Sequence, residues 1–149
     1  MKRIVSIAAS LLLLFNGTGA LYGGWLLIAD PSGARLKMSS SILAHTPFPD
    51  FLLPGVVLFV INGISSLVAI TAMLTQIRQT PVLVALQGCL LSGWIVIQYC
   101  WTQVYHPLQV VMGSVGLLLI VCSVILFRIQ KKEFRLLEKN LQQQRFLFN

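Results

Sequence analysis

The chain has 149 residues, about the length of one domain. Apolar residues make up 56% of it and charged residues only 10%, whereas a soluble domain carries roughly 25% charged residues. So few charges cannot cover a protein surface in water, so the composition excludes an ordinary soluble domain and favours an integral membrane protein. The net charge of +7 does not indicate nucleic-acid binding, because the basic residues lack the interleaved aromatic residues of a base-stacking platform.

Four stretches are long and apolar enough to cross a bilayer as helices. The first starts as a secretory signal peptide does, with Lys2 and Arg3 before a leucine-rich stretch, but its apolar run continues to Ile28. We therefore expect an uncleaved span. The expected spans are residues 4–29, 53–74, 81–103 and 108–127. The predicted fold is all-α: a four-transmembrane-helix bundle over residues 1–128.

The distribution of lysine and arginine predicts the orientation of these spans. Nine of the eleven basic residues lie at the two chain ends and in the connection 76–80, and only Arg35 and Lys37 lie on the other side. Cytoplasmic flanks of membrane proteins carry the excess of basic residues. The chain is therefore expected in a membrane, the bacterial cytoplasmic membrane, with both termini cytoplasmic.

Residues 129–149 form a basic amphipathic tail, which is expected to be helical. An apolar stripe recurs at helical spacing, at Phe134, Leu137, Leu141 and Phe148. Around it lie the predicted membrane-surface residues Lys131, Lys132, Arg135 and Lys139. The tail either lies on the inner leaflet, held by apolar burial and anionic lipid, or extends the fourth span and packs on a neighbouring copy.

Small residues in the first span predict close helix packing. Gly19 and Gly23 are four residues apart, as are Ala20 and Gly24 beside them. Small residues at this spacing let two helix backbones approach closely in a membrane. We expect Gly19 and Gly23 to face another helix, in the same chain or in a second copy.

The spans contain no Asp, Glu, Lys or Arg. Proton-coupled transporters and charge-selective pores depend on such residues, so neither function is favoured. Four neutral amides remain in the spans, at Asn16, Asn62, Gln87 and Gln98. They either hydrogen-bond between helices or line a polar pocket.

One set of residues in the outer half is the predicted ligand site. Trp94, Gln98 and Trp101 are spaced by four and three, hence on one helical face, and Asn62 lies at a comparable depth in the second span. Polar groups in an apolar wall are typical of a small-molecule pocket. In the alternative, this face seals the bundle, with Asn62 and Gln98 bonded to each other or to the backbone.

The outer connection, residues 30–52, is long for a small bundle and is expected to be partly folded. Residues 39–45 are predicted to form a short helix capped by a serine. Residues 47–53 alternate proline with large apolar residues. We expect them to pack on the outer ends of the spans with Phe48 or Phe51 buried, since exposing each would forgo roughly 1.5–3 kcal/mol.

An enzyme built on this chain would have to use the outer ionisable residues. His45 with Asp50, or His106 with Asp30, are the conceivable acid–base pairs. Their spacing enforces neither a pair nor a metal site, so we predict no catalytic residue, no metal and no cofactor.

The favoured function is a non-catalytic accessory or scaffold component that binds a membrane partner or an apolar ligand near the outer face. The alternatives are a small enzyme acting on a lipid or quinone-like substrate there, or an oligomeric channel or facilitator for a neutral solute. The expected partners are the lipid bilayer and either further copies of the chain or another membrane protein, with no nucleic acid.

Overall fold

The computed structural model describes residues 1–44 and 46–147, and within them it is helical, with no strand. Four continuous helical segments, which we call rods, are each long and apolar enough to span a membrane. This confirms the helical fold class and the four expected segments. Two short 3-10 turns lie in the connection after the first rod. The elements are α1 (Lys2–Ala29), η1 (Ala34–Leu36), η2 (Ser40–Leu43), α2 (Leu52–Val57), the π-helical η3 (Leu58–Ile64), α3 (Ser65–Leu74), α4 (Thr80–Thr102) and α5 (Pro107–Leu147).

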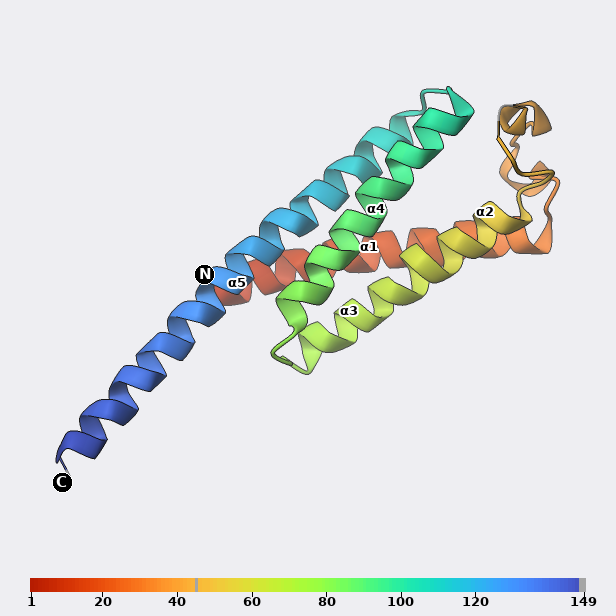
Figure 1. Cartoon of the computed structure of the whole chain (residues 1–149). Coiled ribbons are helices and arrows are strands. Elements are labelled where there is room, and N and C mark those ends of the chain that lie inside the picture. Colours follow the sequence, from red (N-terminus) through yellow and green to blue (C-terminus); the bar gives the residue numbers. More distant parts are fainter. Residues whose placement is uncertain (45, 148–149) are drawn as a thin grey trace.

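The rods form two antiparallel hairpins that cross each other (Figure 1). In one hairpin α1 pairs with the continuous rod α2–η3–α3, and in the other α4 pairs with α5. One end of the molecule carries the connection 30–51 and the α4–α5 turn, and we call it the loop end. The opposite end carries the start of α1, the α3–α4 turn and the projecting part of α5, and we call it the tail end.

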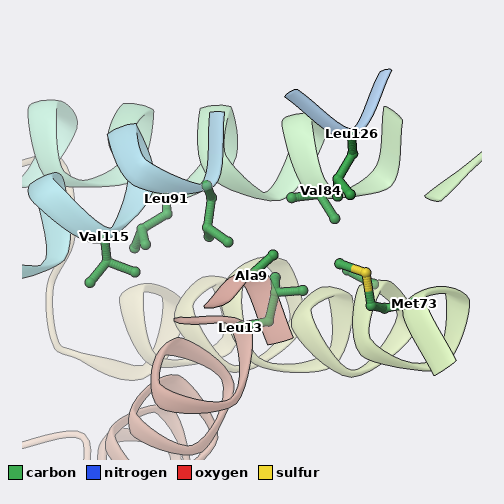
Figure 2. Close-up of a cluster of buried hydrophobic side chains, with 9 residues drawn as sticks. Ala9, Leu13, Met73, Val84, Leu91, Val115 and Leu126 are labelled. Carbon is green, nitrogen blue, oxygen red and sulfur yellow. The ribbon is translucent and has the colours of Figure 1, made fainter. Parts of the chain in front are cut away.

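The hairpins meet in a shared apolar core, part of which Figure 2 shows. Outside this core the same helices are equally apolar: Leu11, Val68 and Leu117 are all exposed. A helix that is apolar on every face needs an apolar surrounding, in a large protein core or in lipid. The core residues labelled in Figure 2 are Ala9, Leu13, Met73, Val84, Leu91, Val115 and Leu126.

The first hairpin packs backbone to backbone through small residues. A Cβ atom added at Gly24 would lie 2.7 Å from the Phe59 backbone nitrogen and 2.9 Å from the Gly55 carbonyl oxygen. At Gly17 it would lie 3.0 Å from Ser66 Cβ. Contacts this close leave no room for a side chain, so the hairpin depends on glycine at these positions.

The predicted pair Gly19 and Gly23 lies beside this contact face rather than on it. Nothing lies within 4 Å of a Cβ added at Gly19, and at Gly23 the neighbour is the Leu58 side chain at 3.6 Å. Within one chain the close approach is therefore made by Gly17, Ala20 and Gly24. Contact of Gly19 with a second copy of the chain stays a prediction.

The loop end is folded over the first hairpin. Ser39 caps η2 by accepting a hydrogen bond from the Ser41 backbone N–H, as expected, while His45 lies outside the described residues. Phe51 is 3% exposed and packs with Leu27 and Leu43 in a second apolar cluster. The expected burial of a phenylalanine in this segment is confirmed.

The tail is a direct continuation of α5, which runs unbroken for 41 residues. At 1.5 Å per residue this helix is roughly 60 Å long, about twice the thickness of a bilayer core. The structure therefore has a helix that continues the fourth span, while contact of this tail with the membrane surface or with a second copy stays a prediction. The basic residues Lys131, Lys132, Arg135 and Lys139 are exposed along it, and Phe148 of the predicted stripe lies outside the described residues.

Candidate functional site

Polar side chains from α1 and the second rod meet in the interior of the first hairpin. Asn16 is only 2% exposed, and its Nδ2 donates to Ser66 Oγ at 2.9 Å and to the Asn62 carbonyl oxygen at 3.4 Å. Ser66 Oγ in turn donates to the same carbonyl at 2.7 Å. An amide predicted only as a possible link between helices thus joins α1 to η3 and α3.

The third amide, Gln87 of α4, joins this cluster to the second hairpin. Its Nε2 donates to the Asn62 carbonyl oxygen at 3.4 Å, and its Oε1 accepts a hydrogen bond from Ser65 Oγ. Hydrogen bonds between membrane helices measure roughly 0.6–2 kcal/mol each. Asn16, Ser65, Ser66 and Gln87 are therefore best explained as structural links between three rods.

The side chain of Asn62 is the exception in this cluster. The residue is fully buried at 0% exposure, and neither Nδ2 nor Oδ1 has a hydrogen-bond partner among the described residues. It lies in η3, where the wider π-helical turn pairs Ser65 N with Val60 O, five residues back. The Asn62 side chain therefore carries an unused donor and an unused acceptor. Burying such groups without partners lowers the stability of the fold.

A cavity of about 70 Å³ opens at the loop end between the folded connection and α4. We call it the loop-end cavity. Trp94, Gln98 and Trp101 of α4 line one wall, and the opposite wall includes Leu58 of η3 and Phe48 of the connection. The Trp94 Nε1–H is buried and has no acceptor in the part of the chain that is described. Most of the residues that line the cavity are apolar, and one of them, Trp94, carries an unused donor.

Three of the four residues in the predicted ligand site share this cavity, and Asn62 does not line it. No hydrogen bond joins Asn62 to Gln98 within the described residues, so the bonded pair expected of a sealing face is not formed there. Sequence reasoning missed Phe48 and Leu58 as wall residues. A signal for Phe48 existed, because an apolar loop beside an aromatic helix end predicts a contact.

The ionisable residues of the loop end are held in local turns. Asp30 Oδ1 accepts a hydrogen bond from Ser32 Oγ at 2.6 Å, and its Oδ2 accepts one from the Arg35 backbone N–H at 3.1 Å. These bonds, the Ser32 side chain first, lower the pKa of the Asp30 carboxyl below its ordinary value. Asp30 therefore has a ready explanation as a turn-forming residue.

Asp50 and His106 are engaged in the same way. Asp50 Oδ1 accepts from the Leu52 backbone N–H at 2.9 Å, and His106 Nδ1 accepts from the Leu108 N–H at 3.2 Å. His106 and Asp30 form no hydrogen bond with each other among the described residues. The pair of His45 with Asp50 is not tested, because His45 lies outside the described residues. Among residues 1–44 and 46–147, no three His, Cys, Asp or Glu side chains form a group that could hold a metal ion.

Among the described residues that line the loop-end cavity, none is titratable. An indole N–H and a primary amide hold a ligand by hydrogen bonding within an apolar wall. No protein-family model, no curated protein and no solved structure matches the chain. Its function is therefore inferred from its own residues.

Proposed function

We propose that the chain is a non-catalytic integral membrane protein that binds an apolar, lipid-like molecule in the loop-end cavity. The tail end lies in the cytoplasm and the loop end on the opposite side. Support for the insertion comes from the four apolar rods. Support for the orientation comes from the placement of nine of the eleven basic residues at the tail end.

The size of the cavity points to a ligand that arrives through the bilayer. Pockets for whole small molecules measure roughly 300–1,000 Å³, whereas this cavity holds about 70 Å³. It can enclose only part of a ligand, such as one segment of an acyl chain. The rest would lie in lipid against Ile97 of α4, an exposed apolar residue that also lines the cavity.

The single observation that carries the proposal is that Trp94, a residue that lines the cavity, has a buried Nε1–H without a hydrogen-bond partner among the described residues. A ligand with one acceptor oxygen, such as an ester carbonyl, would satisfy it. Gln98 on the same wall offers a second donor. Asn62 does not line the cavity, and we leave it out of the proposed site.

The two alternative functions have less support. Among the described residues, the loop end offers an enzyme no acid–base pair, since Asp30, Asp50 and His106 are each bonded within a turn. A channel lined by neutral amides requires them to face a shared path. Asn16 and Gln87 instead bond to neighbours inside a single chain.

The test is photolabelling of the full chain in lipid nanodiscs with the methyl ester of a diazirine-bearing palmitate. Labelled peptides should contain Trp94–Trp101 or Phe48. Trp94→Phe keeps an aromatic side chain but removes the indole N–H donor, and should lower labelling roughly five- to tenfold, the effect of one buried hydrogen bond. Trp25→Phe, the same substitution at an exposed residue that does not line the cavity, is the matched control. Uniform labelling along all lipid-facing helices, unchanged by Trp94→Phe, would refute the proposal.

A further inference from the structure

A second and much larger cavity opens at the tail end. Its volume is about 710 Å³, within the range of pockets that hold small molecules. It lies between the first turns of α1, the end of α3 with the turn that follows, and α5. We call it the tail-end cavity. The loop-end cavity lies at the opposite end of the molecule and shares no wall residue with it.

The wall of this cavity changes character along α1. Lys2 and Arg3 stand at its start, and the neutral residues Ser6, Ile7, Ser10 and Leu11 come further along the helix. Arg3 and Leu11 are separated by roughly 12 Å along the helix axis, at 1.5 Å per residue. The cavity therefore has a basic mouth toward the tail and an apolar interior toward the middle of the rods.

The other helices repeat this gradient. α5 contributes Gln130 near the tail and Leu126 one turn deeper, while the α3–α4 turn contributes Gln76 and the end of α3 contributes Met73. Two basic residues and no acidic residue line the wall. An amphipathic cavity with a net positive mouth complements a molecule with an anionic head and an apolar chain.

We propose that the tail-end cavity binds one anionic phospholipid of the inner leaflet, with the phosphate between Lys2 and Arg3. The upper part of an acyl chain lies against Ile7, Leu11 and Met73. The proposal rests on the membrane insertion and orientation given above, but not on the ligand of the loop-end cavity. A free phosphate ion would use the two charges alone and would leave the apolar interior without a role.

Lys2 already has a weak anionic partner. Its Nζ lies 2.7 Å from Glu133 Oε2 of α5, and the two side chains are 44% and 50% exposed. Exposed ion pairs contribute little, so a lipid phosphate can replace the Glu133 carboxylate. Glu133 is therefore a competitor for the lipid, and its removal should favour binding.

The experiment measures binding of fluorescent phosphatidylglycerol to the full chain in neutral detergent. Removing a basic residue at a lipid surface lowers affinity roughly fivefold, so the double variant Lys2→Gln/Arg3→Gln should bind about 25-fold more weakly. The matched control Arg35→Gln/Lys37→Gln loses the same charges at the loop end and should stay within twofold of the parent. Glu133→Gln should bind a few-fold more tightly.

Three results would overturn the inference. One is an equal loss in both double variants, which would indicate only general charge attraction. Another is equally tight binding of phosphatidylcholine. The third is displacement of the lipid by millimolar inorganic phosphate, which would indicate a site for a soluble anion. Photolabelling of the loop-end cavity, measured on the same double variant, shows separately whether the proposed function stands.

Discussion

Phe48 and Trp101 meet edge to face, with ring centroids 5.0 Å apart and ring planes at 77°. This contact joins the folded connection between the first two rods to the end of α4, and so bridges the two hairpins at the loop end. Aromatic pairs in this geometry contribute about 0.5–1.5 kcal/mol beyond their buried area. Both rings line the loop-end cavity.

Phe48→Leu should loosen the connection without unfolding the protein. The lost ring contact predicts hydrogen exchange in residues 39–51 that is faster by up to about tenfold, with α3 and the tail end unchanged. Phe15→Leu, at an exposed phenylalanine on α1, is the control and should change no exchange rate there. Equal exchange in the two variants would show that the ring pair does not hold the connection.

Gly24→Ala should destabilise the protein by about 1–3 kcal/mol, the cost of overpacking against backbone that cannot move away. Its Cβ would lie under 3 Å from two backbone atoms of the second rod. Gly19→Ala, five residues earlier on the same helix, should be neutral or stabilising by up to about 1 kcal/mol, because alanine favours helix and nothing lies nearby. Thermal unfolding in detergent measures both, and the opposite ranking would place the helix contact on the Gly19 face.

Asn16→Leu and Asn62→Leu should differ although both replace a buried amide with a side chain of similar size. Asn16 loses hydrogen bonds to Ser66 and to the Asn62 carbonyl, for a cost of roughly 1–3 kcal/mol. The Asn62 side chain has no described partner to lose, so its replacement should be neutral or stabilising. Strong destabilisation by Asn62→Leu would mean that the amide bonds a group from outside the chain.

The orientation predicts which single cysteines are reached from outside the cell. In a background without Cys89, Cys100 and Cys122, a membrane-impermeant maleimide should label Ser39→Cys in intact cells. It should label Gln79→Cys and Gln143→Cys only after permeabilisation. Labelling of Gln143→Cys in intact cells would reverse the assignment of the tail end to the cytoplasm.

The lengths and places of the rods could be predicted from the sequence because the length of an apolar run is a local property. The predicted ends at Ala29 and Leu74 coincide with the observed ones. The path of the tail could not be predicted in the same way. Its basic residues permit a helix on the membrane surface and a helix that simply continues, and the choice depends on the backbone between Phe127 and Lys131.

Which face of each rod points inward was harder to predict. Gly19 with Gly23 and Ala20 with Gly24 have the same spacing, so spacing alone does not choose between them. The sequence predicts Asn62 and Trp94 in one site because the position of a residue in its span gives its depth in the membrane. It does not give the direction around each axis, and the π-helical turn of η3 shifts that direction further from the ordinary 100° per residue.

The proposal that a bilayer-borne chain enters the loop-end cavity is tested most directly by tryptophan quenching. The chain has three tryptophans, and Trp25→Phe with Trp101→Phe leaves Trp94 alone in the cavity wall. Methyl 9,10-dibromostearate should quench this fluorescence saturably, at about one molecule per chain. A protein that keeps only Trp25, which faces outward from α1, should instead show quenching in proportion to the amount of probe in the membrane. If Trp94 and Trp25 respond alike, without saturation, the loop-end cavity binds no such ligand.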